Sequence, residues 1–405
     1  MADRIPEGWR ECKLGEVAEI NRNSIDNEYS QNKILYLDTS SITRGKVDCY
    51  QELLLSDAPS RAKRLVKDKD IIYSTVRPIQ RHYGIIKNPP PNLVVSTGFI
   101  VIETNQKEAD SFFIYYFLTS HEIVEYLDII AEASTSAYPS LRPADIESLE
   151  ILLPPLPEQR TIASVLSSLD DKIDLLNREN HTLEQMAEAL FRQWFIEEAD
   201  EKWEEVPLSE VFDFKEGPGI RNWQYRDNGI PFINIRLISN GEIDVSKANF
   251  VSEAEANAKY KHFYLQRKDM VVSTSGTLGK VAIIRNYHLP LLLNTSVIRF
   301  RPKDGINFSF MYGYLRSNEF YECLIDSASG SVQLNFGPIH LKQIVMKIPP
   351  NEKLEYFRKV VDPIYEKFEL NYNQIRTLEK LRDTLLPKLM SGEVRVKLTD
   401  SEVQK

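Results

Sequence analysis

The sequence predicts an α+β protein with two tandem globular domains that are separated by two long helices. Two observations carry this prediction. Segments of the first half return in the second half at an offset of about 195 residues, which indicates an internal repeat. Each copy ends in a Pro-Pro pair that opens a long amphipathic stretch. We expect the domains at 1–153 and 203–349 and the helices, with a C-terminal tail, at 154–202 and 350–405.

The repeat is visible in short matching segments. Three pairs define it: Trp9–Val17 with Trp203–Val211, Lys69–Thr75 with Lys268–Thr274, and Leu153–Pro155 with Ile348–Pro350. The small drift in offset places insertions in loops, as is usual for a duplicated domain. Two similar modules on one chain predict an internal pseudo-twofold arrangement.

Each copy mixes β-type runs with one helical stretch. Strands are predicted at 71–73, 83–86 and 99–102 in the first copy and at 270–272, 281–284 and 297–300 in the second. One helix is expected over 112–130 and another over 308–325, each packing on a mixed sheet. This combination defines the α+β class.

The helix that begins near Pro157 carries a five-heptad apolar seam, which is typical of a coiled coil. Asn371 and Arg382 interrupt the second seam, and Asn180 is the polar residue of the first. Two seams on one chain predict antiparallel packing on each other. The predicted seam residues are Ile162, Leu169, Leu176, Asn180, Leu183 and Leu190, and then Phe357, Ile364, Phe368, Leu378 and Leu385.

The first seam helix is long enough to act as a spacer. Residues 162–195 span ~50 Å as an α-helix, which is about one and a half turns of B-DNA. A plain dimerisation or scaffold coil uses the same residues. The domain repeat is what favours a ruler between two DNA-reading heads.

Composition bounds the class of protein. The chain has 405 residues and a net charge of −9, but residues 203–349 hold 17 Lys/Arg against 15 Asp/Glu. Three scattered cysteines give neither a disulfide framework nor a metal pair. The longest apolar run, 112–118, is too short to cross a bilayer, and the N-terminus has no apolar signal region. We therefore expect a cytoplasmic protein without a membrane partner.

Two basic stretches with interleaved aromatic residues, 61–69 and 259–268, precede the Ser-Thr strand of each copy. A solvated surface is the ordinary explanation for either stretch alone, whereas recurrence at equivalent positions favours contact with DNA phosphates. The candidate phosphate contacts are Lys63, Arg64, Lys67, Lys259, Lys261 and Lys268.

Two polar loops in each copy differ in sequence while their framework is kept: 74–82 and 134–142 in the first, 273–280 and 327–335 in the second. Such segments are often simple turns. A constant frame with divergent polar loops instead favours recognition of base edges. The candidate base-reading residues are Arg77, Arg81, Arg142, Thr277, Lys280, Gln333 and Asn335.

None of the segments that resemble catalytic motifs has the residues or spacing that the motif requires. The six histidines lack zinc-protease spacing, and Gly276–Lys280 lacks the spacing of a phosphate-binding loop. Asn88-Pro89-Pro90-Pro91 ends in proline where a base-stacking methyltransferase site needs an aromatic residue. We therefore expect no catalytic residue, no metal and no cofactor on this chain.

Several segments resemble the specificity subunit of type I restriction-modification systems. Leu153–Ala163 is similar to that family's P-P-L-x-E-Q-x-x-I-A helix start, and Asp269–Lys280 to its recognition-domain loop. Ser329–Gln333 is similar to its S-G-S-x-Q segment, and both copies open with Trp-x4-Leu-x-Glu. Two departures stand out: Asn351-Glu352-Lys353 replaces L-x-E-Q, and Val76-Arg77-Pro78 replaces a Gly-rich loop.

The resemblance implies a non-catalytic subunit that binds double-stranded DNA. Two target recognition domains would each read one half of a bipartite target, and the antiparallel helices would fix the gap. Two modification subunits, which methylate adenine, would dock on this chain, and restriction subunits would join them. S-adenosylmethionine, ATP and Mg would bind those other subunits. A coiled-coil scaffold or adaptor without sequence-specific DNA binding, and a methyltransferase or nuclease, remain the alternatives.

Overall fold

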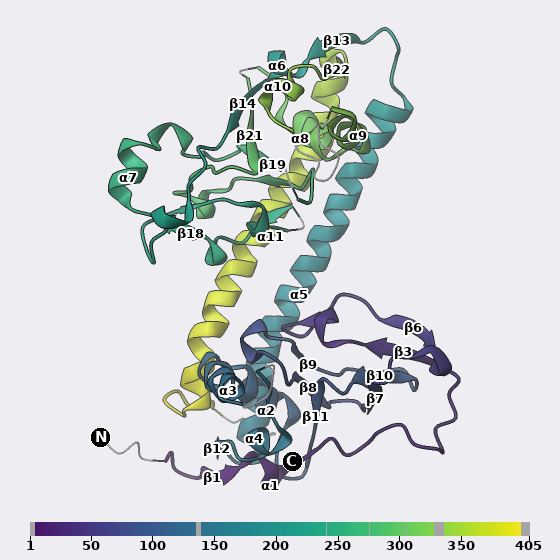
Figure 1. Cartoon of the computed structure of the whole chain (residues 1–405), viewed down its shortest axis with the longest axis vertical. Coiled ribbons are helices and arrows are strands. Elements are labelled where there is room, and N and C mark those ends of the chain that lie inside the picture. Colours follow the sequence, from purple (N-terminus) through teal and green to yellow (C-terminus); the bar gives the residue numbers. More distant parts are fainter. Residues whose placement is uncertain are drawn as a thin grey trace. The chain divides into compact units, whose positions relative to one another are not determined.

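The chain forms two compact units, and each is described by itself. The computed structural model describes residues 5–134, 139–239, 241–274, 276–303, 305–327 and 336–397. Unit 1 comprises Met1–Leu176 and Asn373–Lys405, and unit 2 comprises Asn177–Tyr372. Each unit therefore contains one mixed domain and a part of both long helices, α5 (Leu156–Arg192) and α11 (Asn351–Met390), which are drawn in teal and yellow in Figure 1.

Unit 1 is built on two four-stranded sheets. The central sheet is antiparallel and has the order β2-β11-β8-β9, and the second sheet has the order β6-β3-β10-β7 with β3 and β10 parallel. The central strands are β2 (Ala18–Ile20), β11 (Phe99–Thr104), β8 (Ile71–Ser74) and β9 (Tyr83–Ile85). The strands of the second sheet are β6 (Gln51–Leu54), β3 (Lys33–Leu37), β10 (Leu93–Ser96) and β7 (Ala62–Leu65). Two further two-stranded ladders pair β1 (Arg10–Lys13) with β12 (Glu150–Leu153) and β4 (Ile42–Thr43) with β5 (Lys46–Val47).

Unit 2 repeats the central sheet of unit 1. Its antiparallel order β14-β21-β19-β20 matches β2-β11-β8-β9 strand for strand. The strands are β14 (Phe212–Glu216), β21 (Val297–Pro302), β19 (Met270–Ser273) and β20 (Val281–Ile283). Two-stranded ladders join β13 (Glu204–Pro207) to β22 (Val345–Ile348), β15 (Ile230–Phe232) to β18 (Asn249–Val251), and β16 (Ile238–Ser239) to β17 (Glu242–Ile243).

The structure confirms the predicted strands. The two copies also share strand register and the backbone angle of an equivalent lysine. Ile71 pairs with Ile102 in the first sheet, and Met270 pairs with Phe300 in the second. The lysines that precede these strands, Lys69 and Lys268, have φ of 70° and 69°. A left-handed backbone at the same place in both copies is uncommon for lysine and indicates a shared turn.

The two long helical predictions were wrong in one respect, because each stretch is broken by a serine. Residues 112–130 form α2 (Ser111–Thr119) and α3 (His121–Glu132), and residues 308–325 form α8 (Phe308–Arg316) and α9 (Asn318–Ser327). Ser120 and Ser317 take extended backbone angles, with ψ of 150° and 155°. Apolar periodicity continues through both breaks, so it does not reveal them, whereas serine readily leaves a helix. The remaining helices are α1 (Leu14–Val17), α4 (Pro143–Glu147), α6 (Leu208–Val211), α7 (Glu253–Ala258) and α10 (Pro338–Leu341).

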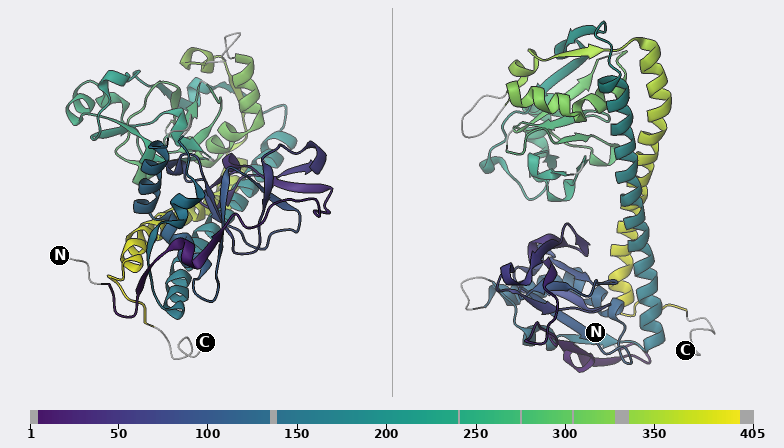
Figure 2. Two further views of the ribbon diagram at one scale, coloured as in Figure 1. Left: turned by 60° about the horizontal axis from the view of Figure 1, so that its bottom comes forward. Right: turned by 90° about the vertical axis from the view of Figure 1, so that its right-hand side faces the viewer.

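Within each unit, α5 and α11 pack antiparallel along the predicted seam (Figure 2). In unit 2, Asn371 donates from Nδ2 to Oδ1 of Asn180 at 2.9 Å, while further along α5 Phe191 meets Phe357. In unit 1, Arg382 pairs with Asp170 at 2.7 Å. Asn371 and Arg382, which interrupt the heptads, are therefore partnered across the helices. All predicted seam residues are buried or half-buried.

Each domain packs on the helix segments of its own unit and shares a hydrophobic core with them. The core of unit 1 joins Phe113 of α2 and Ile102 of the sheet to Ile162 of α5. The core of unit 2 joins Phe300 and Phe310 to Phe357 of α11. These fully buried side chains fix each sheet relative to the helix segments of the same unit. Among the described residues, no helix has the length and apolar character needed to span a membrane.

Candidate nucleic-acid interface

The predicted base-reading loops leave one end of the central sheet in each unit. Because neighbouring strands are antiparallel, the carboxyl ends of β14 and β19 and the amino ends of β21 and β20 lie at the same end. The connection from β19 to β20 starts here, as does the equivalent connection from β8 to β9 in unit 1. Loops gathered at one end of a rigid sheet are a common position for binding residues.

A buried serine hydroxyl shapes this loop in both units. Ser273 Oγ donates to the carbonyl of Thr277 at 2.6 Å and accepts the N–H of Lys280 at 2.9 Å. Ser74 Oγ donates to the carbonyl of Val76 at 3.2 Å and accepts its N–H at 3.3 Å. In unit 2 the loop also needs Gly279, which has φ of 74° and would place a Cβ 2.8 Å from the Tyr321 ring.

The described residue at or next to the end of the second polar loop contacts the first loop in each unit. Leu141 donates its N–H to the carbonyl of Thr75 at 2.8 Å, and Phe336 donates its N–H to the carbonyl of Thr274 at 3.4 Å. In unit 1 the structure therefore brings together the described parts of the two segments that the sequence singled out separately, whereas 328–335 of unit 2 lie outside the described residues. Two of the candidate base-reading residues, Gln333 and Asn335, lie outside the described residues.

The remaining base-reading candidates differ in how their side chains are engaged. Arg77 and Thr277 are exposed, and Arg77 has a left-handed backbone with φ of 47°. Arg81 contacts His121 Nδ1 at 3.4 Å. Arg142 pairs with Asp145 at 2.9 Å, and Lys280 donates from Nζ to the carbonyl of Ile238 at 3.3 Å, so DNA would share or replace these bonds. Arg77 and Thr277 are thus the best placed of the group to meet a ligand.

The candidate phosphate contacts lie on different elements in the two units, so the two basic stretches are not structurally equivalent. Lys63 is exposed on β7, and Arg64 beside it is half-buried, which lowers the pKa of its guanidinium. Lys67 pairs with Glu103 at 3.2 Å. Charge that is already paired offers less attraction to phosphate.

In unit 2, Lys259 and Lys261 flank the buried Tyr260 at the end of α7, and both are exposed. Lys268 instead places its Nζ 5.3 Å from the centre of the Phe308 ring, at the first residue of α8. Sequence recurrence therefore reflects the shared turn at Lys69 and Lys268 more than a shared basic surface.

A buried aspartate follows that turn in each unit, but the neighbouring charge differs: it is positive beside Asp269 and negative beside Asp70. The carboxylate of Asp269 binds Arg301 through Nε at 2.6 Å and through a terminal nitrogen at 2.7 Å. At the equivalent place next to Asp70 the strand carries Glu103. Burial, reinforced by Glu103 and opposed by a backbone N–H from Lys67, raises the pKa of Asp70 to about 6.

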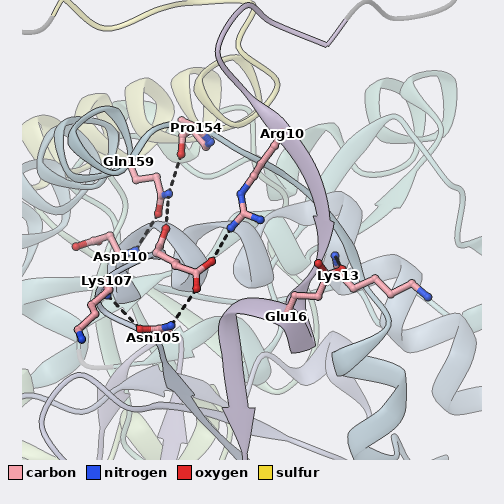
Figure 3. A network of polar contacts seen from close by, with 9 residues as sticks. Arg10, Lys13, Glu16, Asn105, Lys107, Asp110, Pro154 and Gln159 are labelled. Carbon is pink, nitrogen blue, oxygen red and sulfur yellow. Dashed lines mark hydrogen bonds and ion pairs between the residues drawn. The ribbon is translucent and has the colours of Figure 1, made fainter.

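The glutamine that carries much of the family resemblance has a structural role (Figure 3). Gln159 is fully buried; its Oε1 accepts the N–H of Asp110 at 2.8 Å, and its Nε2 donates to the carbonyls of Glu108 and Pro154 at 3.0 and 2.8 Å. The start of α5 is thereby tied to the connection between β11 and α2. Arg10 on β1 adds an ion pair to Glu108 at 2.8 Å.

The neighbouring Glu158 joins segments from both ends of the described chain in unit 1. It accepts the indole N–H of Trp9 at 3.1 Å and two bonds from Arg395 at 2.6 and 2.9 Å. The equivalent position in unit 2 is Lys353, which places its Nζ 5.1 Å from the Trp203 ring. Sequence reasoning found Trp9 as part of the repeat but missed Arg395, because nothing near it in sequence signals its partner.

No cluster of three or more His, Cys, Asp or Glu side chains suited to a metal ion occurs within the described residues. What the two sheet ends present instead is hydroxyl, guanidinium and ammonium groups on short loops. Such groups donate hydrogen bonds to base edges and to phosphates.

Comparisons with known proteins agree along the length of the chain. The model of the type I restriction modification DNA specificity domain matches residues 6–185 and 200–380. The HindI specificity subunit of Haemophilus influenzae is 27% identical over 95% of this chain and 99% of its own length. The MjaIX specificity subunit of Methanocaldococcus jannaschii is 27% identical over 97% and 95%.

A solved structure shares the fold. The type I restriction-modification S subunit of Mycoplasma genitalium aligns over 96% of this chain and 98% of its own, with 18% identity and a TM-score of 0.51. The family model matches each copy of the repeat separately. The chain therefore belongs to the type I restriction-modification DNA specificity family.

Proposed function

We propose that this chain is the DNA-recognition subunit of a type I restriction-modification complex and that each domain reads one half of a bipartite target. The observation that carries the proposal is the doubled family match, one to each copy. The equivalent placement of the connections from β8 to β9 and from β19 to β20, at the same end of the repeated four-stranded sheet, supports it.

Base reading is assigned to the loops at these sheet ends. An arginine can bind the O6 and N7 atoms of guanine with two parallel hydrogen bonds, which suits the exposed Arg77. The hydroxyl of Thr277 can donate to or accept from a base edge. The exposed Lys63, Lys259 and Lys261 are assigned to phosphates, where a lysine acts as a point charge.

The two long helices are proposed to set the gap between the half-sites and to dock the modification subunits. At 1.5 Å per residue, the 37 residues of α5 extend for about 55 Å. The seam residues on both helices hold them together within each unit, and the buried pair of Asn180 and Asn371 supports a fixed register. A spacer of fixed length and register is what a constant gap requires.

The chain is proposed to work without an active site of its own, in the cytoplasm. Two adenine-methylating modification subunits and the restriction subunits are the proposed partners, and they would bind S-adenosylmethionine, ATP and Mg. The support is that the relatives are named specificity subunits of type I restriction enzymes.

Selection of DNA from a randomised duplex pool tests the recognition proposal. The full chain, with its modification subunits if it needs them, is incubated with the pool, and the bound fraction is amplified and sequenced. Enrichment of a split motif with a fixed gap is expected. Enrichment of no motif would favour the scaffold alternative.

The spacer role has a matched pair of variants. Leu176→Ala with Leu183→Ala shortens two seam residues, whereas Leu175→Ala with Met186→Ala shortens residues of the same helix that are 48% and 49% exposed. The seam variant should bind targets with more than one gap length, because a weakened seam holds the helices less rigidly. If both variants keep the single gap of the wild type, the helices do not set it.

A further inference from the structure

A third loop leaves the recognition end of the unit 2 sheet, and it exposes a tryptophan. Residues 217–229 connect β14 to β15 and start where β14 ends, beside the amino end of β21. Trp223, in a short 3-10 turn of this loop, is 74% exposed. An exposed tryptophan offers a ligand a large apolar face together with an indole N–H.

Backbone contacts tie the loop to the segment next to the predicted base-reading loop. Gly217 lies so close to Asn294 that a Cβ would be 2.1 Å from its backbone, and Asn294 Oδ1 accepts the N–H of Ile220 at 2.8 Å. Two residues further on, the carbonyl of Ser296 accepts the N–H of Thr274 at 2.9 Å. The segment 294–296 therefore lies between the tryptophan loop and the connection from β19 to β20, and it contacts both.

The far side of the loop is also fixed. Gln224 is buried, accepts the N–H of Arg221 at 3.0 Å and donates to the hydroxyl of Tyr260 at 2.6 Å. Arg226 donates its N–H to the carbonyl of Phe250 at 2.9 Å. Because the backbone is anchored on both sides, Trp223 is presented at little further cost in conformational entropy.

Two basic residues lie on either side of Trp223 in the same loop. Arg221 and Arg226 are exposed, and the guanidinium of Arg226 contacts the carbonyl of Trp223 at 3.2 Å. Through Tyr260 the loop also adjoins the exposed Lys259 and Lys261. Acidic neighbours are present as well: Asp227 and Glu253 are exposed, and Glu255 bonds to Gln224.

We propose that Trp223, Arg221 and Arg226 contact the sugar-phosphate backbone of duplex DNA beside the bases read by the second domain. The indole packs on a deoxyribose face, and the two guanidinium groups bind phosphates on either side. This inference rests on the proposed function, since it adds a contact to the same recognition end. It assigns a sequence-independent role, because sugars and phosphates are the same at every base pair.

The contact belongs to the second domain alone. In unit 1 the corresponding loop follows β2, where Arg22 is held by Glu19 at 3.3 Å and by Glu103 at 3.6 Å. No tryptophan occurs between Ile20 and Lys33. The two half-sites are therefore bound unequally, and the second domain holds its half through an additional backbone contact.

Binding of the full chain to a fluorescently labelled duplex of about 40 random base pairs tests the inference, because the contact needs no particular sequence. Trp223→Ala should weaken binding about tenfold, in line with the loss of one aromatic contact to nucleic acid. Arg221→Gln with Arg226→Gln should reduce the slope of log affinity against log salt by about two phosphate contacts. Met186→Ala, an exposed apolar residue on α5, is the control and should bind like the wild type.

The outcomes separate this inference from the function on which it rests. If the wild type does not bind duplex DNA, the proposed function fails first. If the wild type binds and both loop variants bind equally well with an unchanged salt slope, the loop does not touch DNA and the inference is overturned. Unchanged DNA binding together with loss of a modification subunit from the purified complex would assign the loop to a protein partner instead, which also overturns it.

Discussion

Substitution of Asp70 by Asn should change how the stability of unit 1 depends on pH. The Asp70 side chain is 3% exposed and lies near Glu103, and its pKa is raised from 3.8 to about 6. A carboxylic acid with a raised pKa in the folded state binds a proton more tightly than in the unfolded chain. The extra stability is therefore complete below pH 3.8 and is lost as pH rises through about 6.

The size of the effect follows from the shift. About two pKa units correspond to about 3 kcal/mol, of which about 1.4 kcal/mol is lost between pH 5 and pH 7.5. Asparagine keeps an oxygen for the N–H of Lys67, which Asp70 accepts at 2.7 Å, and it carries no charge at any pH. The free energy of unfolding of the variant, relative to wild type, should therefore rise by about 1.4 kcal/mol over this range.

Urea unfolding followed by hydrogen-exchange mass spectrometry of peptides from β8 and β11 reports on unit 1 alone. Asp269→Asn is the matched control, because the same position in unit 2 binds Arg301 through two hydrogen bonds. That substitution should destabilise unit 2 at pH 7.5, since it leaves the guanidinium without its carboxylate. If the difference between Asp70→Asn and wild type stays constant from pH 5 to pH 7.5, the raised pKa is wrong.

Three further predictions concern the helices and the DNA contact. Gln159→Ala should lower the free energy of unfolding of unit 1 by about 3 kcal/mol, because it leaves buried backbone groups unpaired, whereas the exposed Gln185→Ala on the same helix should have little effect in the same urea titration. Asn371→Leu should destabilise unit 2 by about 1–3 kcal/mol by leaving Asn180 buried without its partner, and Asn180→Leu added to it should restore most of the loss; a double variant less stable than the single one would contradict this. Arg77→Ala should weaken binding most for targets that carry the correct base; equal weakening for all sequences in a competition assay would make it a phosphate contact.

Much of the fold could be predicted because the repeat and the apolar periodicity can be read directly from short stretches of sequence. The heptads of the first helix identified a seam whose residues are all buried or half-buried. The strands around the Ser-Thr segments could likewise be predicted from their short apolar runs. What sequence could not supply is pairing across distance: Asn371 was predicted as an interruption, yet it is the partner of Asn180. The residues around Asn371 in the sequence do not indicate a partner that lies 191 positions away.

The candidate site was predictable in its loops and less so in its charges. The two polar loops of each domain were predicted from the sequence. The structure joins those of unit 1 through the carbonyl of Thr75, and in unit 2 the carbonyl of Thr274 accepts the N–H of Phe336, which directly follows the second loop. The basic stretches looked equivalent in sequence, but one forms strand β7 and the other follows α7. Trp223 was missed because a tryptophan inside a mixed sequence usually belongs to the core, and its exposure depends on the fold around it.

Genome-wide mapping of adenine methylation is the most direct test of the central claim, that this chain chooses the DNA target. The map is compared in cells with and without the chain, with the neighbouring methyltransferase present in both. We expect a methylated split motif with a fixed gap that disappears when the chain is deleted. Methylation that does not change on deletion would show that this chain does not choose the target.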